Sequence, residues 1–205
     1  MRGRDDSPCP RETDVLNVRL NLARTLARSA ANGPGDRFIV WVQGCPLACR
    51  GCWNQDTWAF ERRELWSVKE LAARILTTEG IQGVTFTGGE PFVQARALAE
   101  LAQLVRAAGL SVFVFTGYNI DELVHSEHRA LLEVTDVVVA GRYIHEQRVS
   151  GWAWRGSANQ RVHFLSDRYS VADMDEVAEV EFHLRKDGTL TVTGFPSVPG
   201  ILPRS

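Results

Sequence analysis

The chain has 205 residues, of which 44% are hydrophobic and 23% are charged. This composition is typical of a folded globular protein and excludes the disordered and fibrous classes. The 23 basic and 25 acidic side chains give a formal net charge of −2, so the chain lacks the strong positive field that binds nucleic acid or anionic lipid. We expect one compact domain with small additions, and neither a nucleic-acid nor a membrane partner.

The distribution of apolar residues and cysteines indicates the compartment. Apolar runs such as Phe38–Val42 are far shorter than the roughly 18 residues that a membrane span requires. Residues 1–10 are polar and do not resemble a secretory signal, and four cysteines are too few for a disulfide scaffold. These features predict a cytoplasmic protein.

Three regions are expected along the chain. Residues 1–14 mix Arg, Asp, Pro and Glu without periodicity, which predicts a flexible tail in which Cys9 is incidental. Residues 15–167 form the expected core domain. Residues 168–205 are expected to form a C-terminal hairpin and tail that pack on the core.

The first predicted elements lead to a cluster of cysteines. Val18, Leu20 and Leu22 alternate with polar residues, which predicts a strand. The glycine-rich segment 32–36 predicts a turn, and Phe38–Val42 is expected to be a buried strand. The cysteines therefore begin just past the carboxyl end of a strand.

Strands and helices then alternate. Ser67 and Glu70 have the spacing of a capping box, which predicts a helix that reaches about Glu79. The remaining pattern predicts strands at 84–87, 111–115 and 136–140, a helix that Gly109 closes, and a further helix start at 119–122.

This alternation predicts an α/β fold with parallel strands. Helices are expected to cover both faces of the sheet, or its outside if the sheet closes. The pattern changes after Trp154, where a short strand is predicted at 162–165. An Asp-Gly turn between 180–184 and 189–193 then predicts a β-hairpin added at an edge.

Three cysteines lie within eight positions, at Cys45, Cys49 and Cys52. Three soft thiolates this close can share one metal centre. A structural zinc site needs a fourth ligand, but the nearest histidine is His125, so only a distant residue would complete it. A four-iron cluster held by three cysteines leaves one iron open to a substrate or cofactor. We favour the cluster, and a zinc or redox-thiol site stays the alternative.

These residues resemble the radical S-adenosylmethionine (SAM) enzymes. C-x3-C-x2-C after a strand resembles the signature of that family, and Thr87-Gly-Gly-Glu-Pro91 resembles its second-strand motif. The resemblance implies a partial (β/α) barrel with a [4Fe-4S] cluster whose open iron is chelated by SAM. It assigns the cluster to Cys45, Cys49 and Cys52, and the contacts with SAM to Gly51, Trp53, Gly88, Gly89, Glu90 and Thr116.

Further matches narrow the resemblance to the activating proteins of anaerobic ribonucleoside-triphosphate reductase. The matching segments are 33–35, 41–46, 51–58, 116–118, 141–143 and 156–161. The resemblance implies that a reduced cluster splits SAM, and that the 5′-deoxyadenosyl radical takes hydrogen from a glycine of the reductase. It also implies a reductant such as flavodoxin or ferredoxin. Two positions differ from the usual pattern, since the family has Asp at Glu90 and often an acidic residue at Ala140.

Two other functions stay open from the sequence. One is a radical SAM enzyme that modifies a peptide or small metabolite, and the other is a non-catalytic iron-sulfur or zinc protein for sensing or partner binding. Several residues also have structural interpretations. Glu90 alone resembles a helix-start carboxylate. We expect loop bridging from Asn159, Gln160 and Arg161, packing from Trp152 and Trp154 rather than the anchoring of a partner protein, and shielding of the cluster from water by Trp53 and Trp58.

Overall fold

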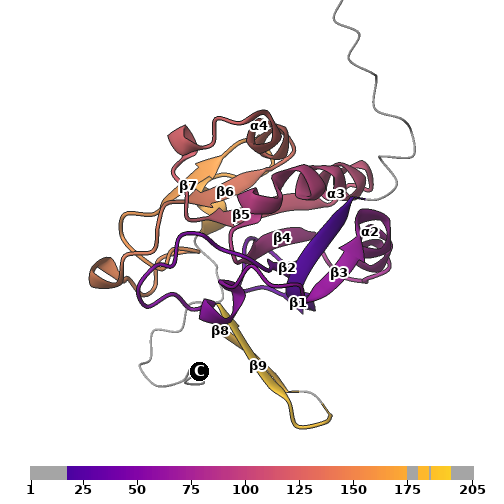
Figure 1. The fold of residues 1–205 in the computed structure, drawn as a ribbon, viewed down its shortest axis with the longest axis horizontal. Coiled ribbons are helices and arrows are strands. Elements are labelled where there is room, and N and C mark those ends of the chain that lie inside the picture. The colour runs from indigo at the N-terminus through magenta and orange to yellow at the C-terminus, as the bar shows by residue number, and fades with distance from the viewer. Residues whose placement is uncertain (1–17, 175–179, 185, 195–205) are drawn as a thin grey trace, which may run out of the picture.

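The computed structural model describes residues 18–174, 180–184 and 186–194 (Figure 1). The tail predicted at 1–14 and the end of the chain from 195 lie outside this part. Seven strands form one sheet in the order β3-β1-β2-β4-β5-β6-β7. They are β1 (Arg19–Ser29), β2 (Arg37–Val42), β3 (Glu64–Ser67), β4 (Gly83–Gly88), β5 (Ser111–Thr116), β6 (Val137–Ala140) and β7 (Arg161–Phe164). Strands β2, β4, β5 and β6 are parallel, whereas β1, β3 and β7 join antiparallel.

The α-helices pack against one face of the sheet (Figure 1). They are α2 (Val68–Leu76), α3 (Ala95–Ala107) and α4 (Ser126–Glu133). Alternate strand residues such as Phe38, Val40 and Val84 point to these helices, since successive side chains of a strand face opposite sides. Of the two arrangements expected from the sequence, the described residues adopt the one with helices on a single side. Closure into a partial barrel stays a prediction.

The opposite face is covered by the segments that follow β6 and β7. Phe113, Val137, Val139 and Trp154 form a second buried cluster there. The ring of Trp154 meets that of Phe113 edge-on, with 5.2 Å between their centroids. The packing role expected for this tryptophan is confirmed.

A fully buried arginine lies at the start of β2. Arg37 donates from Nε to Thr85 Oγ1 (2.8 Å), from Nη1 to Pro34 O (3.0 Å) and Ser111 Oγ (2.9 Å), and from Nη2 to Val84 O (2.8 Å) and Ser111 O (3.1 Å). All of these acceptors are neutral oxygens. Burial therefore lowers the pKa of Arg37, and the side chain links β2, β4 and β5.

Three local predictions differ from the structure. β1 runs on to Ser29 because bulges after Leu22 and Leu26 break the period of two that marks its start. β3 is absent from the predicted strands, because polar and apolar side chains do not alternate clearly along its four residues. α2 ends at Leu76, before Thr77, whose hydroxyl bonds to the last-turn carbonyls.

The helix start expected at 119–122 is a single 3-10 turn, Ile120–Glu122. The Glu122 carboxylate accepts from the Asn119 N–H (2.7 Å), which forms a capping box between the first and last residues of this short segment. The helix that follows, α4, begins at Ser126.

Strands β8 (Val180–Leu184) and β9 (Leu190–Gly194) pair antiparallel in a separate sheet. The Asn32 amide donates to Thr193 Oγ1 (2.6 Å), and the Ala30 N–H donates to Glu181 (3.0 Å). These bonds attach the pair to the segment that follows β1.

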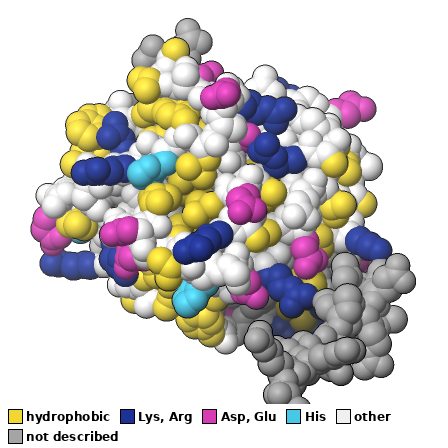
Figure 2. Space-filling view, turned by 90° about the horizontal axis from the view of Figure 1, so that it is seen from above, with side chains coloured by type: hydrophobic (Ala, Val, Ile, Leu, Met, Phe, Trp, Pro, Cys, Tyr) yellow, Lys and Arg dark blue, Asp and Glu magenta, His cyan; other side chains and the backbone are white. Residues whose placement is uncertain are grey.

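The surface carries both signs of charge. Figure 2 shows acidic and basic side chains interspersed over the coloured part of one face, which agrees with the small net charge. In the part of the chain that the structure describes, no helix has the length and apolar character needed to cross a membrane.

Candidate cofactor site

The cysteine loop starts where β2 ends, because Cys45 follows Val42 by three positions. Its first part is attached to the segment that returns toward β3. The Gly44 N–H donates to Thr57 O (2.8 Å), and the Cys45 N–H donates to Trp58 O (3.0 Å). Cys45 is thus held at the carboxyl edge of the parallel strands, where sites form in α/β folds.

The thiols are reduced and partly buried. Burial raises the pKa of Cys45 and of Cys49. Backbone N–H groups oppose this effect, those of Leu47 and Ala48 at Cys45 and that of Tyr143 at Cys49. Such N–H groups favour the thiolate form, which is the form that binds iron.

The donor set fits an iron-sulfur cluster. The third thiol, Cys52, accepts from the Asn54 N–H (3.4 Å), so each sulfur of the loop has a backbone N–H directed at it. Within the described ranges, no three His, Cys, Asp or Glu side chains converge as ligands of one metal ion. Thiolates that each bind a different iron of a cluster do not have to meet at one point. Soft, partly covered thiolates are the ligands that such clusters take.

The loop after β4 packs directly against the cysteine loop. The Gly89 N–H donates to Val42 O (2.8 Å), and the Glu90 N–H donates to Gly44 O (2.9 Å). A Cβ on Gly89 would lie 2.3 Å from Gly44 O, and one on Gly88, whose φ is +97°, would lie 2.7 Å from Trp41 Cα. Gly89 is therefore required for the two loops to approach this closely, and Gly88 for the end of β4 to lie against β2.

Gly89→Ala is expected to separate the two loops. Its methyl group would clash with the backbone oxygen of Gly44, which can move only if the loop backbone moves. We expect a loss of about 2–3 kcal/mol in the free energy of unfolding, measured with urea on the cluster-free chain. Gly109→Ala is the control, since nothing lies within 4 Å of its Cβ although its φ is +86°. Equal losses in the two variants would contradict the steric argument.

Glu90 is buried and joins this loop to the one after β5. Its Oε1 accepts from the Phe92 N–H (3.0 Å) and from Thr116 Oγ1 (2.8 Å), and its Oε2 accepts from the Gly117 N–H (2.8 Å). Burial raises the pKa of Glu90 to about 7, against these donors. The bond to Phe92 is the helix-start role considered above. Since each carboxylate oxygen accepts two bonds, Oε2 keeps one position for a further donor.

Two further residues lie at this junction. Leu47 packs on Gly117, where an added Cβ would lie 2.3 Å from its Cδ1. Arg142 donates to Glu122 (2.8 and 3.1 Å) and lies over the Tyr118 ring. Leu47 belongs to no periodic pattern or ligand spacing, and Arg142 stands in the matching segment 141–143 without an assigned role, so only the fold reveals their contacts.

The predicted residues divide into two groups in the structure. Gly89 and Glu90 contact Gly44 at the start of the cysteine loop directly, whereas Gly88 lies against Trp41 of β2 and Thr116 reaches the loop only through its bond to Glu90. Gly51 and Trp53 lie instead against the segment after β6, at His145 and Arg148 respectively. Figure 1 shows this segment beside the cysteine loop on the left of the molecule.

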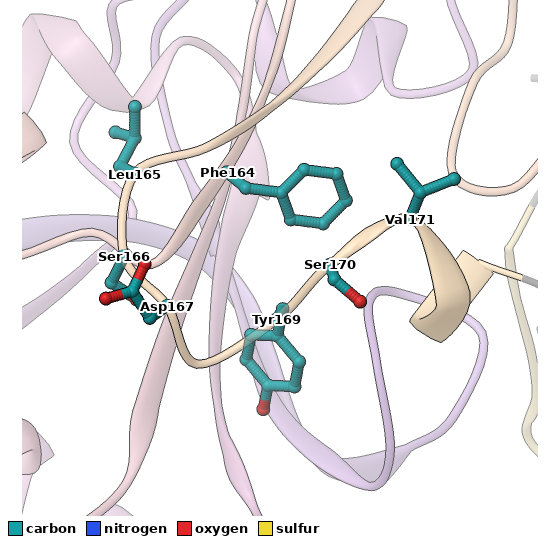
Figure 3. A pocket seen from close by; sticks show the side chains of 7 residues that line it. All are labelled: Phe164, Leu165, Ser166, Asp167, Tyr169, Ser170 and Val171. Atoms are coloured by element: carbon teal, nitrogen blue, oxygen red, sulfur yellow. The ribbon is translucent and has the colours of Figure 1, made fainter.

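A hollow of about 470 Å³ lies elsewhere, lined by Phe164–Ser166 and other residues up to Val171 (Figure 3). β7 is antiparallel to β6, and Phe164 pairs with Val137 at the start of β6. The hollow is therefore at the amino end of the parallel strands, and it contains none of the predicted site residues.

Comparisons with known proteins agree on one family. Residues 31–163 match the 4Fe-4S single cluster domain. The anaerobic ribonucleoside-triphosphate reductase-activating protein of Haemophilus influenzae is 34% identical over 152 residues, which cover 70% of this chain and 97% of the relative. The protein of that name from Vibrio cholerae is 37% identical over 141 residues, covering 64% and 90%. The chain belongs to the anaerobic ribonucleoside-triphosphate reductase-activating proteins.

This membership confirms the resemblance to the reductase-activating proteins, and the domain match supports the expected iron-sulfur cluster. The reductase-activating protein of bacteriophage T4 is a further relative, 35% identical over 150 residues that cover 70% of this chain and 93% of its own. Among solved structures, QueE from Escherichia coli aligns with 48% of this chain and 52% of its own at 22% identity, with a TM-score of 0.39. That likeness is too slight to bear on the fold.

Proposed function

We propose that this reductase-activating protein installs a glycyl radical on an anaerobic ribonucleotide reductase in the cytoplasm. When bound, a reduced [4Fe-4S] cluster supplies one electron to the sulfonium of SAM, so the C5′–S bond breaks and methionine and a 5′-deoxyadenosyl radical result. The hydrogen atom that this chemistry requires would come from a glycine Cα of the reductase, which would leave the glycyl radical there and 5′-deoxyadenosine as the by-product. A flavodoxin or ferredoxin is the class of protein that returns the electron.

Cys45, Cys49 and Cys52 hold three irons in this proposal, and the fourth iron is left for SAM. The observation that carries the proposal is the contact between the cysteine loop and Glu90. The Glu90 N–H donates to Gly44 O (2.9 Å), which fixes the Glu90 backbone beside the residue before Cys45, and the carboxylate is near enough to contribute to the raised pKa of Cys45, after the larger effect of burial. Its free acceptor position on Oε2 suits the ammonium group of SAM. The relatives are named for activating the reductase, which supports that protein as the partner.

The remaining residues position the ligand and exclude water. Gly89 keeps the backbone close to the cysteine loop, Gly88 keeps the end of β4 close to β2, and Thr116 holds the Glu90 carboxylate by its hydroxyl (2.8 Å). Trp53 covers the loop beside Cys52. No side chain has to act as acid or base, because a hydrogen atom rather than a proton is transferred.

The proposal is tested by anaerobic reconstitution with iron and sulfide, reduction, addition of SAM and quantification of 5′-deoxyadenosine. We expect product from wild type and none from Cys49→Ala, which removes a cluster ligand. Cys9→Ala, a cysteine outside the motif, is the matched control and should behave as wild type. The reductase is then added, and electron paramagnetic resonance is used to detect the glycyl radical.

Each outcome separates one alternative. Product without a radical on the reductase would favour a peptide or metabolite substrate. A chain that holds a four-iron cluster but forms no product, even with the reductase present, would indicate a sensing or binding protein. A chain that takes up no cluster would contradict the proposal.

A further inference from the structure

The second half of the cysteine loop lies under the segment 142–148, which we call the covering segment. His145 occupies the space of a missing side chain, because a Cβ on Gly51 would lie 2.7 Å from His145 Nδ1. Next to it, Arg50 Nη1 and Glu146 Oε1 form an ion pair at 3.2 Å. The covering segment thus contacts consecutive residues of the loop.

The contacts continue on both sides of Gly51. The guanidinium of Arg148 lies over the Trp53 ring, 4.9 Å from its centroid. The backbone N–H of Tyr143 faces the Cys49 sulfur, and the Tyr143 hydroxyl interacts with the Trp53 indole. Cys49, Arg50, Gly51 and Trp53 are therefore each contacted by a residue of the covering segment.

The covering segment is itself fixed from its other side. Gln160 Oε1 accepts from the Gly156 N–H (2.8 Å) and the Ser157 N–H (3.1 Å), while its Nε2 donates to Gly141 O (3.1 Å). The Ile144 N–H donates to Ser157 Oγ (3.2 Å). The sequence segment around Gln160, whose role the proposed function leaves open, connects β6 and β7 to the covering segment.

The two halves of the cysteine loop thus have different supports. The first half is held by backbone hydrogen bonds, from Cys45 to Trp58 and from Gly44 to Thr57 and Glu90. The part from Cys49 to Trp53 includes one short backbone bond, Cys52 N–H to Cys49 O (3.0 Å), and otherwise rests on the covering segment. Ala48 lies between the halves with φ +44°, a conformation that persists only where surrounding contacts impose it.

We propose that the covering segment is the positioning element for the second half of the cysteine loop, and that it fixes Cys49 and Cys52 where they bind the cluster. This inference rests on the proposed function and deepens it. His145 fills the space beside Gly51, and Gln160 acts on the segment from outside it, by holding Gly141 at its start and Ser157, whose hydroxyl accepts from the Ile144 N–H. Neither residue ligates iron, so both act through the loop.

A steric double-mutant cycle tests the contact in the cluster-free chain. His145→Ala removes the ring above Gly51, and Gly51→Ala adds a methyl group that meets that ring. We expect each variant to speed amide hydrogen exchange in residues 49–53 by about fivefold or more, without a change at Cys45. Because both variants disturb one contact, their effects should not add in the double variant.

Gln160→Ala is the second test, because it loosens the covering segment without touching the loop. It should speed exchange in the same residues. Loaded protein gives two further readouts: iron release to a chelator should be several times faster, and the midpoint potential of the cluster should rise in His145→Ala because water reaches the cluster. His125→Ala, an exposed histidine of another loop, is the matched control and should leave all three quantities unchanged.

The outcomes separate this inference from the proposed function. The inference about the covering segment would be overturned if both His145→Ala and Gln160→Ala equal wild type in amide exchange, iron release and midpoint potential. This holds even if SAM is cleaved. Faster exchange spread over the whole chain would also overturn it, since that reports general destabilisation. A wild-type chain that takes up no cluster would refute both proposals.

Discussion

Arg37→Ala is expected to lower the free energy of unfolding by about 3–5 kcal/mol, measured by urea denaturation of the cluster-free chain. The side chain donates to oxygens of three other segments, and its removal takes one buried donor from each of the carbonyls of Val84, Ser111 and Pro34. A buried cavity adds to this loss, because the side chain is fully enclosed. The effect is therefore larger than that of an ordinary core substitution.

Two glycines are fitted around this side chain. A Cβ on Gly83 would lie 2.5 Å from Arg37 Nη2, and one on Gly33 would lie 2.8 Å from its Cδ. Arg37→Lys should recover little, because one ammonium group cannot reach acceptors arranged for the planar guanidinium. Arg28→Ala is the control, since Arg28 pairs with Asp36 at the surface and its loss should leave stability close to wild type. A loss below about 1 kcal/mol in Arg37→Ala would show that water replaces these bonds.

Arg37 also shows why part of the fold was hidden in the sequence. A charged residue at the start of an apolar run predicts an exposed strand end. The hydrogen-bond acceptors of the Arg37 side chain come from segments that only the tertiary structure brings together. The strands that follow were predictable because Phe38–Val42 and Val137–Ala140 are apolar throughout, as buried parallel strands are. The length of β1 was not, since its bulges interrupt the alternation.

The candidate site divides in the same way. Motifs of adjacent residues located the cysteine loop and Gly88–Glu90, and the rule that sites form at the carboxyl ends of parallel strands predicted that they meet. The contact of Gly51 with His145 joins positions far apart in the chain. No local pattern carries such information, so the covering segment was visible only as a set of matching residues without a role.

Glu90→Gln is expected to stabilise the cluster-free chain at pH 8 while it weakens the binding of SAM. Burial raises the pKa of Glu90 from its ordinary 4.5 to about 7, so the folded chain binds a proton that the unfolded chain releases. The stability of wild type therefore falls as pH rises from about 4.5 to above 7. The difference between the two pKa values corresponds to a loss of about 3 kcal/mol in the free energy of unfolding of wild type over this pH range. Glutamine carries no charge, so the variant does not undergo this loss.

Urea denaturation of both chains between pH 5.5 and 8.5 measures this difference, and a constant difference would contradict the burial of an ionisable carboxylate. Glu70→Gln is the control of opposite sign. Its capping bonds lower the pKa of Glu70, so the stability it contributes is present above 4.5 and is lost only at more acid pH. Across the range measured, Glu70→Gln should therefore differ from wild type by a constant amount.

The binding half of the prediction follows from the same carboxylate. An ammonium group beside Oε2 favours the charged form of Glu90, so SAM binding should weaken as pH falls below about 7. Loss of a charge-assisted hydrogen bond in Glu90→Gln should weaken SAM binding by about tenfold to a hundredfold, measured by calorimetry on the loaded protein. A variant that is more stable at pH 8 yet binds SAM as wild type does would place the ammonium elsewhere. The requirements of stability and of SAM binding are therefore opposed at Glu90. The negative charge of its carboxylate favours the binding of SAM, whereas burial of the same charge destabilises the folded chain.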